Sequence, residues 1–159
     1  MEKKAQAWGF DLMVGVSIFF LGMLLFFLYA LNLPSERDET FTEMNYEGNL
    51  IGDSLLSEGF PRNWNSDNVV NIGILSDGKV NNTKFKEFYD LALVDYNRTR
   101  RIFNVENDYY VYFSRPVTVD GVVIHGIGLN DSNPRNVVKV TRVVVHDNEV
   151  KNLNINVWN

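Results

Sequence analysis

The sequence predicts an α+β fold, with a long N-terminal membrane-spanning helix followed by helices packed on a mainly antiparallel β-sheet. Two observations predict it. An apolar run without charged side chains extends over residues 12–31. Beyond it, helix-like segments come first and several consecutive strand-like segments follow, instead of a regular alternation of the two. We divide the 159 residues into a leader and flank (1–11), a transmembrane helix (12–33) and a head domain (34–159).

The apolar run has the length of a membrane span. At about 1.5 Å per residue, its 20 positions cover roughly 30 Å, the thickness of a bilayer core. The run is longer than the apolar region of about 7–15 residues in a secretory signal, and no small-x-small cleavage site follows it, so we expect it to be retained. Lys3 and Lys4 precede the run, whereas Glu36, Asp38 and Glu39 follow it. This asymmetry predicts a single-pass protein with a cytoplasmic N-terminus and an extracytoplasmic head.

A second helix is expected directly after the span. Pro34 ends the first helix, and Ser35 caps a new one that runs to Gly59. Gly48 and Gly52 leave a flat strip on this helix that a partner could approach. Its apolar side chains recur at helical spacing, at Phe41, Met44, Ile51 and Leu55.

A strand and a third helix come next. Residues 69–75 read as a strand, and a turn follows at 76–78. Thr83 is the expected N-cap of a helix that ends near Phe103. The apolar face of this helix comprises Phe85, Phe88, Ala92, Tyr96, Thr99 and Phe103, and the solvent face comprises Lys84, Glu87, Asp90, Asn97 and Arg101.

The C-terminal third is strand-like. We expect a strand over 109–114, a hairpin over 117–124 around Asp120-Gly121, and two long strands over 137–146 and 150–158. In the last strand, Leu153, Ile155 and Val157 alternate with Asn152, Asn154 and Asn156, which predicts one buried and one wet face.

Composition excludes several functions. The net charge of −5 lies entirely beyond the span, which disfavours nucleic acid or anionic lipid as a partner of the head. The absence of cysteine excludes disulfides, thiol catalysis and thiolate metal sites. His125 and His146 are expected to be half-buried strand residues, and only their convergence with a carboxylate would indicate a metal site or an anchored hydrolase. A cluster at the end of the third helix, Arg98, Arg100 and Arg101, is better explained by the helix dipole than by a polyanion site.

No catalytic residue, metal site or cofactor is therefore predicted, and no P-loop or G-x-S-x-G motif occurs. We expect a protein that is not an enzyme. Three sequons, at Asn81, Asn97 and Asn130, are candidate glycosylation sites in an extracytoplasmic head, although a chain so rich in asparagine also contains such matches by chance.

The leader carries the most specific motif. Lys3-Lys4-Ala5-Gln6 places two cations and a small residue before a glutamine, just ahead of the apolar run. This arrangement resembles the class III (prepilin-type) signal of archaeal type IV pilin-like proteins. The resemblance implies cleavage after Ala5 by a prepilin peptidase, with Gln6 as the new N-terminus. A cut before Phe10 is the alternative.

A second, looser resemblance lies in the head. Gly59, Pro61 and Trp64, then Ile72-Gly73-Ile74-Leu75, then Asn82-Thr83-Lys84-Phe85, are similar to a pattern in archaeal pilin-like ectodomains, as is the last strand ending Val157-Trp158. Gly59 and Pro61 turn the chain off its helix, and we expect Trp64 to be a core residue at the junction of helix and sheet.

The resemblance implies a structural subunit, a minor pilin of a type IV pilus-like filament, in which the span packs against copies of itself or other pilin-like subunits. Partners would then be the membrane, the prepilin peptidase and the pilus assembly machinery, with the assembled head at the cell surface. Gly15, Ser17 and Gly22 are the candidate helix-packing residues. Asp11 is the candidate acid to pair with a neighbour's new N-terminus, or else it only marks the membrane boundary. The competing class is an anchored accessory or binding domain, stator-like or adhesin-like, that never polymerises.

Overall fold

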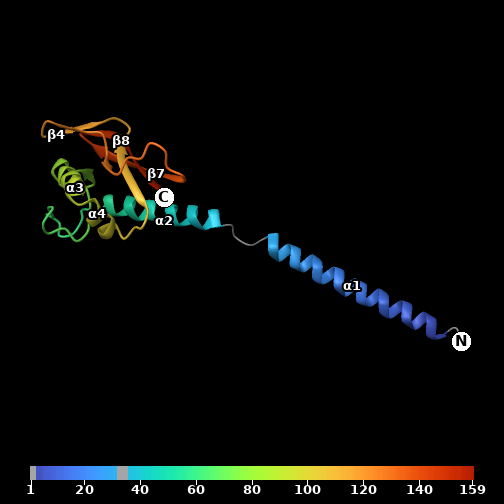
Figure 1. Ribbon diagram of the computed structural model, residues 1–159. Helices are drawn as coiled ribbons and strands as arrows, with labels where there is room; N and C mark the ends of the chain where they lie inside the picture. The colour runs from blue at the N-terminus through green and yellow to red at the C-terminus, as the bar shows by residue number, and fades with distance from the viewer. Residues whose placement is uncertain (1–2, 32–35) are drawn as a thin grey trace. The chain divides into compact units, whose positions relative to one another are not determined.

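The structure is a computed structural model. It describes the backbone of residues 3–31 and 36–159, and the side chains of residues 9–31 and 39–159 (Figure 1). The chain separates into two compact units, Met1–Asp38 and Glu39–Asn159. The second unit comprises residues 39–159 of the expected head, and the name head is kept for it together with the first turn of α2.

The first unit contains one long helix. Helix α1 spans Lys3–Leu31, and its segment Gly9–Leu31 has 23 residues, with a mean hydropathy of 2.4 over its most apolar 18 residues. This segment is long and apolar enough to cross a membrane, and it begins one turn before the span expected from the sequence. The last two residues of the expected span, the stop at Pro34 and the cap at Ser35 lie outside the described residues.

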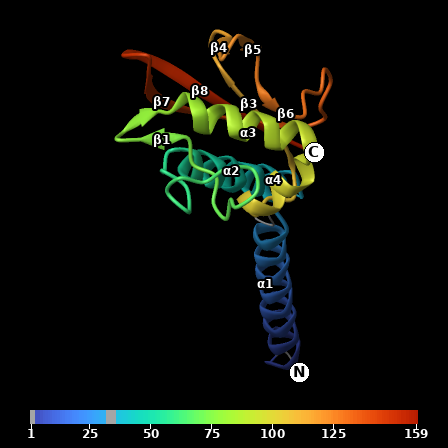
Figure 2. The ribbon, with the colours of Figure 1, turned by 90° about the vertical axis from the view of Figure 1, so that its left-hand side faces the viewer.

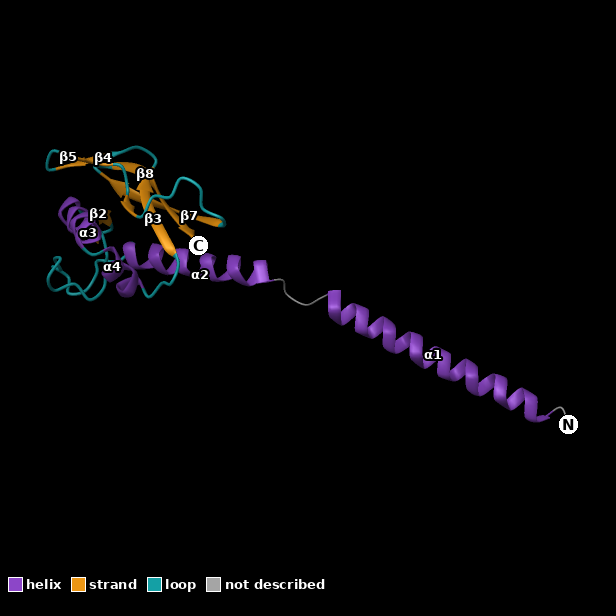
Figure 3. Ribbon diagram, in the orientation of Figure 1, coloured by secondary structure: helices purple, strands orange, loops and turns teal. Residues whose placement is uncertain are grey.

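The head is an α+β domain, as predicted. Three helices lie on one face of a four-stranded antiparallel sheet: α2 (Glu36–Leu55), α3 (Asn82–Val94) and α4 (Tyr96–Phe103) (Figures 2 and 3). The strand order of the sheet is β6 (Ile127–Gly128), β3 (Asp108–Phe113), β8 (Glu149–Trp158) and β7 (Val137–His146). Two small antiparallel ribbons complete it, β1 (Leu75–Ser76) with β2 (Lys79–Val80), and β4 (Val117–Val119) with β5 (Val122–Ile124).

Helix α2 packs closely on the sheet through its glycines. A Cβ atom on Gly48 would lie 2.7 Å from Cγ2 of Val140, and one on Gly52 would lie 3.0 Å from Nε of Arg142. The flat strip expected to receive a partner is therefore occupied by the chain's own sheet, and that expectation was wrong. The helix also ends earlier than expected, at Leu55.

The expected third helix is two helices. Asp95 leaves the helical conformation, and its carboxylate accepts a hydrogen bond from the backbone N–H of Arg98 at 2.8 Å, which caps α4. A short carboxylate competes with the helical backbone for such bonds, so the chain breaks there. Asn81, and not Thr83, is the N-cap of α3. The predicted apolar face survives the break, because Phe88 and Phe103 still meet edge to face in the core, 5.6 Å apart.

The expected strand over 69–75 is wrong. The segment forms one isolated bridge, between Phe60 and Asn71, and otherwise runs irregularly beneath the end of α2. The backbone N–H of Ile74 donates to the carbonyl of Leu55, so most of the apolar run packs against a helix end. Only its last residue, Leu75, enters a strand, β1. Trp64 is buried as predicted, and its Nε1 donates to the carbonyl of Gly73 at 2.8 Å.

The C-terminal strands agree with the sequence. Both two-residue turns, Asp120-Gly121 and Asp147-Asn148, have positive φ at both positions, as type I′ hairpins require. One detail differs. Asn154, expected on the wet face, is only 5 % exposed, because β8 is a central strand and Thr141 Oγ1 of β7 donates to Asn154 Oδ1 at 3.1 Å.

Candidate functional site

The side chains of α1 from Leu12 to Leu31 form a surface without charged groups on any side. All described residues from Gly9 to Leu31 are exposed, and Asp11 is the one charged residue among them. Large apolar side chains occur throughout the helix, from Phe10, which is 67 % exposed, to Leu31, which is 79 % exposed. A helix that is hydrophobic all round requires lipid or other apolar helices as its surroundings.

The three predicted packing residues differ in their surroundings. Apart from the adjoining residues and the backbone of the helix itself, no described atom lies within 4 Å of the Cβ position of Gly15 or Gly22, so each leaves an open notch in the helix surface. The hydroxyl of Ser17 donates to the carbonyl of Met13 at 2.8 Å, within its own helix. At 3.6 residues per turn, Gly22 lies about 20° from Gly15 around the helix, whereas Ser17 lies about 200° away. The glycines therefore share one side, and Ser17 lies on the other.

The leader residues are described only in part. Lys3, Lys4, Ala5 and Gln6 belong to the helical backbone of α1, but their side chains lie outside the described residues. Asp11 is exposed. The cleavage site and the two roles considered for Asp11 remain predictions.

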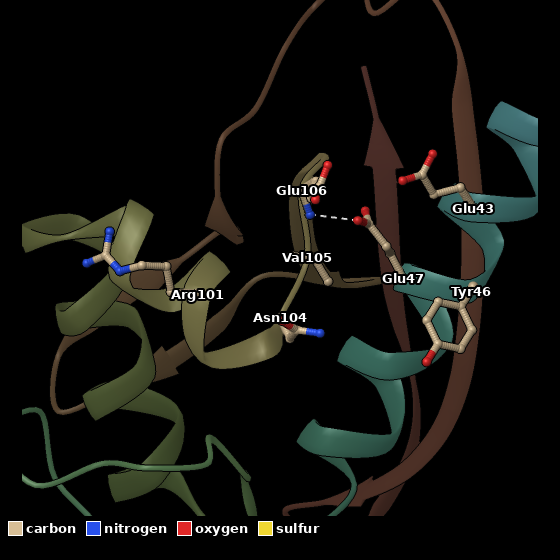
Figure 4. A pocket seen from close by; sticks show the side chains of 7 residues that line it. All are labelled: Glu43, Tyr46, Glu47, Arg101, Asn104, Val105 and Glu106. Carbon is tan, nitrogen blue, oxygen red and sulfur yellow. Dashed lines mark hydrogen bonds between the residues drawn. The ribbon is translucent and has the colours of Figure 1, made fainter.

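In the head, a pocket of about 360 Å³ lies between α2 and the end of α4 (Figure 4). Asn104 has a left-handed conformation with φ of 57°, which ends α4 and turns the chain back toward α2. The residues that line the pocket are Glu43, Tyr46, Glu47, Arg101, Asn104, Val105 and Glu106.

The acid at the base of this pocket is structural. Glu47 is only 4 % exposed, and its carboxylate accepts hydrogen bonds from the backbone N–H groups of Glu106 at 2.6 Å and Asn107 at 3.1 Å. Glu47 was not among the residues predicted to be functional or buried. One signal was available, since Glu47 lies three residues after Met44 and four before Ile51, on the buried stripe of its helix. Both carboxylate oxygens of Glu47 hold the chain after α4, so Glu47 joins two segments of the head at this pocket.

The two histidines lie in different environments, and neither is half-buried as expected. His125 is exposed and lies outside the strands. His146 is 1 % exposed and stacks on Phe113, with ring centres 5.5 Å apart. Its Nε2 lies 2.6 Å from Asn82 Oδ1, and its Nδ1 lies 3.0 Å from Lys151 Nζ. Burial lowers the pKa of His146, although the carboxylate of Asp147, 3.3 Å from Nδ1, acts in the opposite direction, so the ring is neutral at pH 7.

No metal site is formed in the described part of the chain, which contains no group of three or more His, Asp or Glu side chains placed to hold an ion. The histidines and a carboxylate therefore do not converge there as a hydrolytic metal site would require.

The arginine cluster holds α4 to the rest of the head. Arg98 Nη1 donates to the carbonyl of Ser66 at 2.8 Å, and Arg100 Nη1 lies 3.4 Å from a carboxylate oxygen of Asp108. Arg101 is the most exposed of the three. Arg100 and Arg101 lie in the last turn of α4, as the helix-dipole interpretation predicts. Arg98 lies in the first turn of α4, because the helix breaks at Asp95, so that interpretation was wrong for Arg98.

Lys84 was expected in solvent and is buried. Its Nζ donates to the carbonyl oxygens of Glu58 at 2.7 Å and Leu75 at 2.9 Å, and burial lowers its pKa. The ammonium thereby holds the start of α3 to the segment that follows α2. No feature of the local sequence marks this role, because both acceptors are backbone carbonyls distant in the chain.

The three sequons have different accessibility. Asn81 caps α3, and its Nδ2 donates to Ser76 Oγ at 3.2 Å. Asn97 lies within α4, and Thr99 of its sequon is fully buried. Asn130 is exposed in the irregular segment that follows β6. A glycan on the folded head is therefore best accommodated at Asn130.

No family model matches the chain, and no curated protein or solved structure is similar to it at a significant level. The function is therefore argued from the residues and their contacts.

Proposed function

We propose that the chain is a structural subunit, of the minor pilin class, of an archaeal type IV pilus-like filament, and that α1 anchors it in the membrane before assembly. The observation that carries the proposal is the 23-residue segment of α1 that has no charged group from Leu12 to Leu31 and follows a short leader with two lysines. Lipid surrounds this helix first, and neighbouring helices replace the lipid in the filament.

Cleavage of the leader converts the membrane-anchored chain into a subunit that can enter the filament. Lys3 and Lys4 hold the N-terminus on the cytoplasmic side, and a prepilin peptidase hydrolyses the peptide bond after Ala5. The apolar helix stays attached to the new N-terminus at Gln6. The head then lies outside the membrane, where it makes subunit contacts or adheres to a surface.

The head supports a structural role. Its buried polar groups are used to join elements: Glu47 holds the chain after α4, Lys84 holds the chain after α2, and His146 contacts both α3 and β8. Groups committed in this way stabilise the domain and are not available for chemistry on a substrate.

Leader processing tests the proposal directly. In cells with an active prepilin peptidase, mass spectrometry of the membrane form should find a chain that begins at Gln6. Ala5→Trp should leave only the full-length chain, because a bulky residue does not fit the scissile position. Ala30→Trp, at the far end of α1, is the matched control and should be processed normally. A full-length wild-type chain as the only species would remove the main support for a filament subunit.

Cross-linking within α1 separates a filament from a simple anchor. The chain has no cysteine, so single cysteines report without background. Phe26→Cys places a thiol on the side of the glycines, about 20° from Gly15, and Leu24→Cys places one about 180° away. A filament core surrounds the helix, so both variants should form disulfide-linked dimers. Cross-links from Phe26→Cys alone would indicate a dimer, and none from either would indicate the accessory domain that never polymerises.

A further inference from the structure

One edge of the sheet in the head is long and regular. Strand β7 is the outermost strand and pairs with β8 in continuous register over ten residues, from Val137 opposite Trp158 to His146 opposite Glu149. No residue interrupts this register, so β7 contains no bulge that would bend the edge away. The strand at the opposite edge, β6, has only two residues.

The register determines which backbone groups of β7 face outward. A two-residue turn joins β7 to β8, so the residues that flank it, His146 and Glu149, form a hydrogen-bonded pair, and every second pair after them does the same. The other side of β8 shows the same alternation. The N–H of Ser114 donates to the carbonyl of Asn152, so the backbone groups of Asn152 point toward β3 and not toward β7. The N–H and C=O groups that point away from β8 therefore belong to Val137, Lys139, Thr141, Val143 and Val145.

These outward groups have no partner among residues 39–159. In that range, no backbone group and no side chain forms a hydrogen bond with the outward N–H or C=O groups of the five residues. Two of their side chains are apolar and well exposed, Val137 at 41 % and Val143 at 67 %. The edge thus combines free backbone groups with exposed β-branched side chains, the combination that invites a further strand.

The two charged residues of β7 differ in their surroundings. Arg142 Nη2 donates to Asn49 at 2.9 Å and to Asp53 at 3.0 Å, on the face that α2 covers. Lys139 is exposed, and its Nζ lies 5.6 Å from the centre of the Tyr112 ring. Of these two charges, Lys139 is the one that an approaching strand would meet.

We propose that β7 pairs antiparallel with β7 of a second copy of this chain, around a twofold axis at Thr141, so that two four-stranded sheets become one. In this register Thr141 lies opposite Thr141, Lys139 opposite Val143, and Val137 opposite Val145. No like charges face each other, and all five outward residues of each strand bond, with about ten hydrogen bonds in total. A register centred on Lys139 would place the two lysines opposite each other and is disfavoured.

Two arguments favour a second copy over another extended chain. The edge is self-complementary in its side chains, as an interface between identical copies around a twofold axis requires. The anchoring by α1 proposed above would also hold copies in one membrane and raise their effective concentration. Only this second argument rests on the proposed function.

A cysteine at the twofold axis tests the pairing. Thr141→Cys places two thiols on directly opposite residues of a hydrogen-bonded pair, where Cα atoms lie about 5.5 Å apart, a distance that a disulfide spans. The full-length chain in native membranes should then form a disulfide-linked dimer on mild oxidation. Val150→Cys is the matched control, because Val150 is 73 % exposed but lies on β8, one strand in from the edge, and it should remain monomeric.

Charge at Val143 tests the register. In the Thr141→Cys background, Val143→Lys places a lysine of each copy opposite Lys139 of the other, which makes two like-charge pairs, one on each side of the axis. Their repulsion should lower the dimer yield about tenfold at low salt. Val143→Glu faces the same lysines with the opposite sign and should keep or raise the yield. About 1 M salt should remove the difference, because it screens exposed charges within about 3 Å. Circular dichroism of each variant verifies that the head is folded.

Two results would overturn the pairing: no dimer from Thr141→Cys in a folded head, or equal dimer yields from Val143→Lys and Val143→Glu at low salt. Leader processing and α1 cross-linking are measured on the same membranes. A dimer through β7 with an unprocessed leader would refute the filament subunit alone, whereas processing without the dimer would refute this pairing alone.

Discussion

The carboxylate of Glu47 offers the most direct test of how the head is held together. It joins α2 to the chain that follows α4, with two hydrogen bonds from backbone N–H groups at 2.6 and 3.1 Å. A hydrogen bond to a charged group contributes about 1.5–3 kcal/mol. Glu106 is exposed, so water can replace part of the lost interaction when the carboxylate is removed. We therefore expect Glu47→Ala to lower the free energy of unfolding by about 3 kcal/mol.

Two further variants make this expectation specific. Glu47→Gln keeps one acceptor oxygen but turns an amide NH₂ toward the second backbone N–H, and should cost about half as much. Glu43→Ala lies one turn earlier on the same side of the helix, but Glu43 is exposed, so this variant should change stability by less than about 0.5 kcal/mol.

The assay is urea unfolding of the full-length chain in detergent, followed by tryptophan fluorescence. Trp64 and Trp158 are both buried in the head and report its unfolding. Hydrogen exchange at the amides of Glu106 and Asn107 should also accelerate in Glu47→Ala. A cost for Glu47→Ala no larger than that for Glu43→Ala would refute the assignment of Glu47 as a structural residue.

Two other predictions concern the core. The lowered pKa of His146 means that, as the pH falls below 6.5, the unfolded chain takes up a proton before the folded chain does. The stability due to neutral His146 should therefore be complete above that pH and be lost as the pH falls through the lowered pKa. Urea unfolding between pH 7.5 and 5 should show this decline in the free energy of unfolding, and His146→Gln should lack it. Gly48→Ala should destabilise the head by about 1 kcal/mol although alanine favours helices, because overpacking against Val140 costs more than the helix gains; a more stable variant in the same unfolding assay would contradict the close approach of α2 to the sheet.

The parts of the fold that were predicted correctly depend on local patterns. The apolar helix, the two type I′ turns and the long strands that flank Asp147-Asn148 follow from residue order alone, because hydrophobic periodicity and left-handed turn residues act over a few positions. The errors occurred where a local sequence pattern is compatible with two different backbone structures. The run at 69–75 is apolar enough for a strand, but its backbone bonds to the end of α2, and Asp95 interrupts a helix that periodicity alone would continue.

The polar residues inside the head show the same limit. Lys84 and His146 were assigned to the wrong surroundings, and Glu47 was not identified, because their partners are backbone carbonyls, amides or side chains from distant segments. Whether a charged side chain lies in water or in the core depends on which groups the fold brings to it.

Composition and local residue order were enough to establish a helix able to span a membrane, a leader with two lysines and a small residue, and a head with helices and an antiparallel sheet. These properties are independent of long-range contacts. Three others required the folded chain: β7 lies at an open edge, the glycines of α2 serve the chain's own sheet, and the buried charges bind backbone. Each of these depends on which segments become neighbours in the fold. The free energy that favours one arrangement comes from many contacts between residues distant in the chain, and no short stretch of sequence contains them.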